Sequence, residues 1–231
     1  MKKGLAIFLC AVLFSIPVFA QGTEALRQEL YSKIKCKRCI NMTIDKCQCP
    51  DAKEMRGYID GLLEAELSRD EIFYKVAKKY SPNMITDVKI REAAEKRLLK
   101  EIGNKRPQIV IEPATFNFKE AYKKQGIVKK EFKIYNKGNE KLIITNIKAS
   151  CVCASASLTI GKTKSPDFGT KGAGGGWQAI IKSGESGVLE VNLDLAHASI
   201  RPGKLTRTIH VTSSDPLNPE ITVSVEAEVK E

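Results

Sequence analysis

Four cysteines with reactive spacing, Cys36, Cys39, Cys47 and Cys49, lie within fourteen residues of this chain. Cys36 and Cys39 have the CxxC spacing, which allows two thiols to close a small disulfide ring and to open it again. This chemistry requires a thiolate, because the thiolate and not the thiol is the nucleophile. We therefore predict that Cys36 and Cys39 are the catalytic pair of a dithiol that exchanges with a dithiol on another protein.

Basic side chains beside Cys36 suggest which thiol attacks first. Lys35 and Lys37 flank Cys36, and nearby cations favour the thiolate by lowering a cysteine pKa. Cys36 also follows a predicted helix, whose C-terminal partial negative charge opposes that effect. We expect the cations to prevail, so that Cys36 attacks and Cys39 resolves the mixed disulfide.

Cys47 and Cys49 allow three interpretations. They could bond to each other in a tight ring that is easily reduced, or each could pair with Cys36 or Cys39 as a structural disulfide. All four sulfurs could instead bind a metal ion, with zinc or copper as the candidates. Thiol exchange itself requires no cofactor, so a metal is an alternative to the redox interpretation.

Cys151 and Cys153 form a second pair, farther along the chain. On a strand they would point to the same face with Cα atoms roughly 6.5 Å apart, at the outer edge of disulfide reach. A direct bond would need a bend in the chain. Otherwise the pair could be two packed thiols, could bind a soft ion such as Cu(I), or could exchange with the thiols of the first domain.

The N-terminus has the pattern of a secretory signal peptide, residues 1–20. Two lysines precede an apolar run, and Ala20 is a typical small residue before a cleavage site. Cleavage would remove Cys10 and two lysines, leaving six cysteines and lowering the net charge from +11 to +9. An even number of cysteines suits an oxidising compartment, and we expect a periplasmic protein. Its basic surface could contact an anionic membrane, and nucleic acid is not an expected partner.

Residues 21–103 are predicted to form a helical domain of three or four helices. Apolar residues recur at helical spacing in four segments, and Ser68 with Glu71 has the spacing of a capping box. The predicted helices cover 23–35, 50–63, 68–80 and 87–102. Residues 104–231 then change to short alternating runs separated by turn signals, which predicts an antiparallel immunoglobulin-like β-sandwich and an α+β chain of two domains.

The predicted strands cover 108–112, 115–118, 127–135, 141–149, 188–195, 205–212 and 221–229. The expected core residues are Phe116, Phe118, Phe132, Ile134, Ile143 and Ile147. The glycine-rich stretch 161–177 is predicted to be a flexible loop insertion.

Part of the helical domain resembles a known family. The matching residues are Lys35-Cys36-Lys-Arg-Cys39-Ile-Asn41-Met-Thr43-Ile44, Pro50, Met55-Arg56, Ser68-Arg-Asp-Glu71-Ile72 and Lys79-Tyr80. Residues 26–85 are in these features similar to the cytochrome c maturation protein H (CcmH) family, which pairs a CxxC loop with a three-helix bundle. The resemblance implies that Cys36 and Cys39 are the redox pair, and that Asn41 and Thr43 shape the loop. It also implies apocytochrome c as the dithiol substrate, haem lyase components as partners, and haem only through such a partner.

The second domain resembles a periplasmic immunoglobulin-like family of unknown function, related to the ASH/MSP-type sandwiches. The matching segments include Phe116-Asn-Phe118, Ser150-Cys151-Val-Cys153-Ala, Arg201-Pro-Gly203-Lys and Thr212-Ser-Ser-Asp215-Pro216. The resemblance implies a sandwich and no particular activity. The leading hypothesis is thus an exported thiol–disulfide oxidoreductase of cytochrome c maturation. The alternative is a non-enzymatic periplasmic protein that binds metal or acts as an adaptor.

Overall fold

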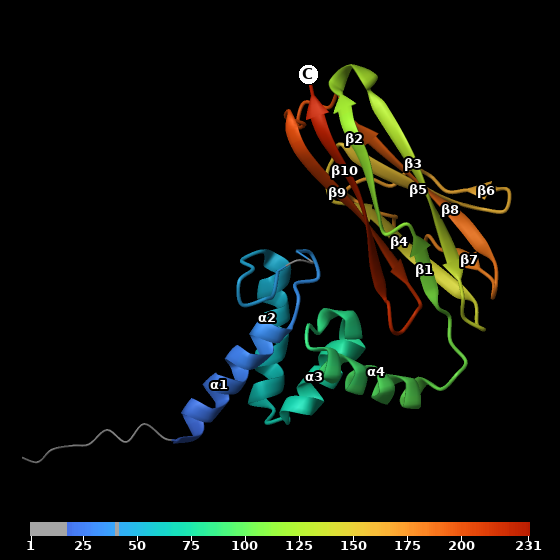
Figure 1. Ribbon diagram of the computed structural model, residues 1–231. Helices are drawn as coiled ribbons and strands as arrows, with labels where there is room; N and C mark the ends of the chain where they lie inside the picture. The colour runs from blue at the N-terminus through green and yellow to red at the C-terminus, as the bar shows by residue number, and fades with distance from the viewer. Residues whose placement is uncertain (1–17, 40–41) are drawn as a thin grey trace, which may run out of the picture.

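A helical part and a β-sandwich follow each other along the chain (Figure 1). The structure is a computed structural model that describes residues 18–39 and 42–231. Residues 1–17 of the predicted signal peptide lie outside the described residues, as do Ile40 and Asn41. Within the described residues, no helix has both the length and the apolar character needed to cross a membrane.

The helical part contains four α-helices, as the periodicity predicts. They are α1 (Val18–Lys33), α2 (Pro50–Glu64), α3 (Arg69–Lys79) and α4 (Val88–Ile102), with a short 3₁₀ turn, η1 (Pro82–Met84), before α4. Side chains at the N-caps accept backbone hydrogen bonds that each first turn would otherwise lack: Cys49 caps α2, Ser68 caps α3 and Asp87 caps α4. The fully buried centre of this part includes Leu30, Ile34, Met55, Ile59 and Ile72.

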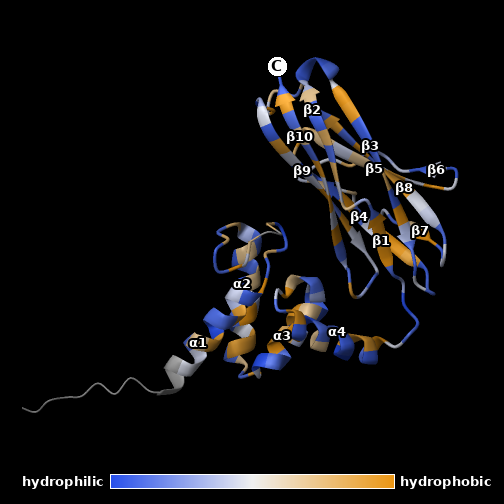
Figure 2. Ribbon diagram, viewed as in Figure 1, coloured by the Kyte–Doolittle hydropathy of each residue, from blue (hydrophilic) through white to orange (hydrophobic). Residues whose placement is uncertain are grey.

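Ten strands form the second part: β1 (Ile109–Glu112), β2 (Thr115–Tyr122), β3 (Ile127–Asn136), β4 (Leu142–Ala149), β5 (Ala154–Ile160), β6 (Thr163–Lys164), β7 (Ala179–Ile181), β8 (Ser186–Asp194), β9 (Gly203–Ser213) and β10 (Glu220–Lys230). A second 3₁₀ turn, η2 (Lys123–Gln125), joins β2 to β3. One sheet has the order β1-β3-β8-β5-β6 and the other β2-β10-β9-β4-β7. Hydrophobic and hydrophilic residues alternate along strands such as β10, as expected when one face packs on a core and the other meets solvent (Figure 2).

Three features of the sandwich differ from the prediction. β2 pairs in parallel with β10, so this sheet is mixed and not antiparallel throughout. β5 was not predicted, because its alanines and serines have weak strand preference, yet it lies between β8 and β6 and is largely buried. Ile143 is not in the core. A register shift between Ile144 and Asn146 turns Ile147 inward together with Leu142 and Ile144.

The turn between β9 and β10 joins the two parts. Leu217 at this turn is buried within the helical core and not in the sandwich. Beside it, the fully buried carboxylate of Asp215 accepts hydrogen bonds from the backbone N–H of Leu217 (2.9 Å) and of Ile109 (3.1 Å). The Arg106 guanidinium lies 3.6 Å from the same carboxylate. The turn therefore contacts the helices, the linker and β1 together.

Candidate functional site

The cysteine loop, residues 34–49, lies between α1 and α2 and is held to the helical part by main-chain hydrogen bonds. The N–H of Lys35 donates to the carbonyl of Met84 (2.7 Å), and the N–H of Ile44 donates to the carbonyl of Ile34 (2.9 Å). The N–H of Cys36 donates to the carbonyl of Met42 (2.8 Å), which closes the CxxC turn. Within the described residues of the loop, 42–44 thus lie beside 34–36.

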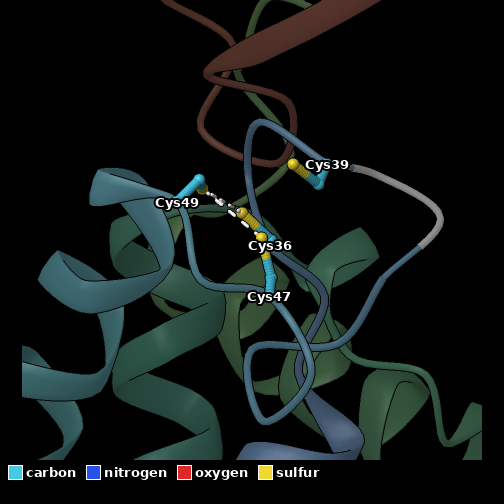
Figure 3. Close-up of side chains that lie close together, drawn as sticks. All are labelled: Cys36, Cys39, Cys47 and Cys49. Atoms are coloured by element: carbon cyan, nitrogen blue, oxygen red, sulfur yellow. Dashed lines mark hydrogen bonds between the residues drawn. The ribbon is translucent and has the colours of Figure 1, made fainter.

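The loop places all four thiols in one cluster (Figure 3). The Sγ atoms of Cys36, Cys39, Cys47 and Cys49 all lie within 4.8 Å of one another, and none of the four is disulfide-bonded. Cys49 Sγ lies 3.4 Å from Cys36 Sγ and 3.4 Å from Cys47 Sγ. Cys36 and Cys47 are buried, whereas Cys39 and Cys49 are half-buried. Cys47 and Cys49, which the CxxC pattern leaves out, are therefore as central to the site as Cys36 and Cys39.

The thiol of Cys49 is more acidic than those of Cys36 and Cys39. It caps α2, and its sulfur accepts a hydrogen bond from the N–H of Ala52 (3.4 Å). Burial alone would raise its pKa, but this bond and those from the Cys47 and Cys36 thiols outweigh burial and lower the pKa of Cys49 to about 7. A thiol at a helix N-terminus is expected to show this behaviour.

Cys36 behaves in the opposite way, which speaks against the prediction that it is the attacking thiolate. Its side chain is 0% exposed, and burial raises the pKa of Cys36 to about 11, although backbone N–H groups of the CxxC turn act against that rise. Burial likewise raises the pKa of Cys39, together with the hydrogen bond that the Cys39 thiol donates to Cys47. The sequence does not show how deeply Cys36 is buried, and burial affects its pKa more than the flanking cations do.

Two of the cations near Cys36, Lys37 and Arg38, are also paired with carboxylates. Lys37 Nζ lies 2.7 Å from a carboxylate oxygen of Glu54 and 3.5 Å from Asp51, and Arg38 pairs with Asp51. Because these carboxylates offset the two positive charges, Lys37 and Arg38 contribute less to stabilising a thiolate on Cys36. The basic residues therefore fasten the loop to α2.

Arg56 also holds the cysteine loop in place, and we did not predict it as a functional residue. Its guanidinium donates to the carbonyl oxygens of Cys47 (2.8 Å) and Ile44. This fixes the turn that leads into Cys47-Gln-Cys49. Only its position among the residues of the family resemblance could have singled it out.

The donor set also suits a soft metal ion. Four thiolates in a tetrahedron at the usual Zn–S distance would have sulfurs about 3.8 Å apart, close to the spacing of this cluster. Cys36, Cys39, Cys47 and Cys49 would be the ligands of Zn²⁺, and thiolates also suit Cu(I). The arrangement can thus either exchange disulfides or hold a metal.

Cys151 and Cys153 are separate from this cluster and are joined by a disulfide with a Cα–Cα distance of 5.3 Å. They lie in the turn between β4 and β5, which provides the bend that a direct bond was expected to need. There the N–H of Ala154 donates to the carbonyl of Cys151 (3.1 Å). This bend brings the Cα atoms closer than an extended strand allows. The Nε of Arg207 lies 3.1 Å from Cys153 Sγ.

A cleft of about 550 Å³ separates the cysteine loop from the outer face of β4, β9 and β10. From the helical part, Lys37, Arg38 and Asp51 line it. The sandwich side includes Lys148, Ala149, Ser150, Thr208, His210 and Glu220. Sequence reasoning could not find this cleft, because its two walls are distant in the chain and meet only through the packing of the two parts.

Comparisons with known proteins concern the sandwich. Residues 109–167 match the model of a family described as a protein of unknown function (DUF1573). No curated protein matches the chain.

Similar solved structures include a protein of unknown function from Porphyromonas gingivalis W83 (16% identity, TM-score 0.40), covering 54% of this chain and 48% of that one. The chain thus spans about half the length of that protein. Others are the ASH/PapD-like domain of human CEP192 (7%, TM-score 0.35, covering 55% and 87%) and the YadV chaperone (13%, TM-score 0.34, covering 53% and 52%). The C-terminal part of this chain is itself a β-rich part of two five-stranded sheets.

Proposed function

We propose that this protein is an exported thiol–disulfide oxidoreductase whose reactive centre is the cluster of Cys36, Cys39, Cys47 and Cys49. The observation that carries the proposal is the position of Cys49. It is half-buried at the N-terminus of α2, and its sulfur lies 3.4 Å from two buried thiols, those of Cys36 and Cys47. An accessible acidic thiol in contact with a second thiol is what disulfide exchange requires.

The proposed reaction uses two thiols of the cluster. The Cys49 thiolate attacks a sulfur of the substrate disulfide, forming a mixed disulfide and releasing the other substrate sulfur as a thiolate. Cys36 or Cys47 then attacks Cys49 Sγ, which breaks the mixed disulfide and releases the second substrate sulfur. The cluster loses two electrons and two protons, and the substrate gains both. Cys39, adjacent to Cys47, would supply a further exchange partner.

The resemblance to the CcmH family supports a substrate for this reaction. We propose the haem-binding cysteines of apocytochrome c as the disulfide that is reduced, with haem lyase components as partners and haem bound only by them. The proposed reaction would then take place in the periplasm, consistent with the signal-peptide pattern of residues 1–20. The basic surface would assist contact with an anionic membrane.

Trapping of the mixed disulfide tests the proposal. We would incubate each single Cys→Ser variant of the cluster with a disulfide-closed apocytochrome CxxCH peptide and map adducts by non-reducing mass spectrometry. The double variant Cys36→Ser with Cys47→Ser should accumulate an adduct on Cys49, because both neighbouring resolving thiols are gone. The Cys49→Ser variant should form little adduct with the peptide. A wild-type cluster that leaves the peptide oxidised, with no adduct in any variant, would refute the oxidoreductase proposal.

A metal centre is the second candidate, favoured by the presence of four sulfurs within 4.8 Å of one another. In this case the protein would be a non-enzymatic metal-binding or adaptor protein, with Zn²⁺ as the expected ion because four cysteines are a common ligand set of structural zinc sites. Metal analysis of the purified protein distinguishes the two. One equivalent of zinc, released only when the thiols are oxidised, would support this candidate. Metal-free protein with full thiol reactivity would support exchange.

A further inference from the structure

The disulfide between Cys151 and Cys153 adds little to the stability of the sandwich. A disulfide stabilises a fold mainly by restricting the unfolded chain, and the effect grows with the length of the loop it closes. Here the two cysteines are only two positions apart. The residue between them, Val152, is 66% exposed and so packs little against the core. A role in chemistry would account for a disulfide at this position better than a role in stability.

Arg207 lies next to this disulfide. Its Nε lies 3.1 Å from Cys153 Sγ, and its Nη1 donates to the carbonyl of Thr206 (2.8 Å). Among the residues that the structure describes, no carboxylate forms an ion pair with Arg207. Burial lowers the pKa of Arg207, but a guanidinium stays protonated in proteins. An unpaired cation thus lies directly against one sulfur of the disulfide.

The two sulfurs differ in access. Cys153 is 2% exposed, whereas Cys151 is half-buried and next to the exposed Val152. An incoming thiolate would therefore reach Cys151 Sγ, and the electron pair of the broken bond would pass to Cys153 Sγ. That is the sulfur beside Arg207, and a positive charge there stabilises the leaving thiolate.

The cleft indicates which thiols could attack. Ala149 and Ser150, which immediately precede Cys151, line the same cleft as Lys37 and Arg38, the two residues inside the CxxC turn. Ser150 is held in place by hydrogen bonds with Thr208, which follows Arg207 on β9. Residues that adjoin the disulfide and residues inside the CxxC turn thus line opposite walls of one cleft.

From this arrangement we propose that Cys151–Cys153 is a second redox-active site, which exchanges electrons with the thiol cluster of the same chain when the cleft closes. The inference rests on the thiol exchange proposed for the cluster. A half-buried cluster thiolate, on Cys39 or Cys49, attacks Cys151 Sγ, and the Cys151–Cys153 bond breaks. A second cluster thiol then displaces Cys151. The cluster loses two electrons and two protons, and the Cys151–Cys153 pair gains them. Because exchange is reversible, the reduced pair can return the cluster to its dithiol state.

Cross-linking within the chain tests the transfer. We would oxidise the cluster of the Cys153→Ser variant with diamide and map disulfides by non-reducing digestion. The free Cys151 thiol should form a disulfide with Cys39 or Cys49 within one molecule. Cys151→Ser is the matched control, because the thiol that it leaves, Cys153, is buried and should cross-link far less. No intramolecular cross-link to Cys151, or one only between two molecules, would overturn the proposal.

The role of Arg207 has its own measurement. Reduction of the Cys151–Cys153 bond by glutathione should be about three- to tenfold slower in Arg207→Met, because the leaving thiolate then lacks the adjacent positive charge. Arg207→Lys, which keeps the charge, should be near wild type. Equal reduction rates in all three proteins would show that Arg207 does not assist the reaction.

The outcomes separate this inference from the proposed function. An adduct of Cys49 with the apocytochrome peptide, without the Cys151 cross-link, would leave the oxidoreductase intact and refute the internal transfer. The Cys151 cross-link without any peptide adduct would support the internal transfer and refute the proposed substrate.

Discussion

The hydroxyl of Ser81 donates a hydrogen bond of 2.7 Å to the main-chain carbonyl of Leu217, inside a buried contact between the helical part and the turn that joins β9 to β10. The two residues are 136 positions apart in sequence. Beside them, the Asn83 amide donates to the Asn218 side chain (2.9 Å). This contact joins the two parts of the chain whose residues line the cleft.

The first prediction concerns Leu217. Leu217→Ala removes a side chain that is buried in the helical core, and such truncations cost about 2–5 kcal/mol in the free energy of unfolding. We expect loss of coupling between the two parts, measured as a lower urea midpoint and as faster proteolysis in the linker 103–108. Leu217→Met, which conserves volume, should change stability by less than about 1.5 kcal/mol. Unchanged proteolysis in Leu217→Ala would show that other contacts hold the two parts together.

The second prediction concerns the pH dependence of thiol reactivity. Because the pKa of Cys49 is about 7 and that of Cys36 about 11, iodoacetamide should label Cys49 increasingly as the pH rises through 7. Cys36 should stay largely unlabelled until far higher pH. Mass spectrometry of the reduced protein from pH 5 to 9 measures both. Faster labelling of Cys36 than of Cys49 at pH 7 would restore Cys36 as the attacking thiol.

The third prediction is that the lowered pKa of Cys49 makes the stability of the protein depend on pH. The pKa of Cys49 is lowered on folding, from 9.0 to about 7. The resulting stabilisation is therefore fully present above pH 9 and is lost as the pH falls through 7. Reduced wild-type protein should gain stability between pH 7 and 9 relative to Cys49→Ser, as measured by urea denaturation. Parallel pH profiles of the two proteins would contradict the shift.

The fourth prediction concerns Arg56. Arg56→Met leaves the carbonyls of Cys47 and Ile44 without their charged donor, and hydrogen bonds to charged groups contribute about 1.5–3 kcal/mol. We expect a loss of stability of that size and faster alkylation of the normally buried Cys47. Arg56→Lys should retain part of the effect. If Cys47 remains as protected in Arg56→Met as in wild type, the guanidinium does not hold the loop.

The fifth prediction concerns Gly138. A Cβ at this position would lie 2.3 Å from the carbonyl oxygen of Arg106 and 2.5 Å from the nitrogen of Gln108, both main-chain atoms. Gly138→Ala must displace the linker, at a cost of roughly 1–3 kcal/mol. Gly174→Ala is the control, because nothing lies within 4 Å of a Cβ there. Equal thermal midpoints for the two variants would mean that the linker shifts freely.

Local patterns were sufficient for most of the elements. Ser68 and Asp87 act as helix caps, and the break at Pro50 begins α2, because capping and helical periodicity depend on neighbours within one or two turns. The alternating strands β3, β8 and β10 follow for the same reason, since a two-residue period shows in any short window. The cysteine spacing likewise indicated thiol chemistry before any contact was known.

Longer-range relations needed the tertiary structure. The stretch 161–177 was predicted to be a flexible insertion. In the structure, however, Phe168 exchanges two main-chain hydrogen bonds with Ala156 and packs against Trp177, with ring centroids 4.7 Å apart. The composition of 161–177 does not show that one of its residues pairs with Ala156, which lies outside the segment. The inward turn of Ile147 has a similar origin, because a register shift changes which face each side chain meets.

Sequence by itself determined that this chain carries a helical CxxC part, a β-rich part and closely spaced thiols, since these depend on residue type and local period. Only the tertiary structure decided that four thiols share one cluster, that burial raises the pKa of Cys36, and that hydrogen bonds lower the pKa of Cys49. It also decided that Cys151 and Cys153 are bonded beside Arg207. Burial, pKa and contact depend on which distant segments pack together, and no local pattern contains that information.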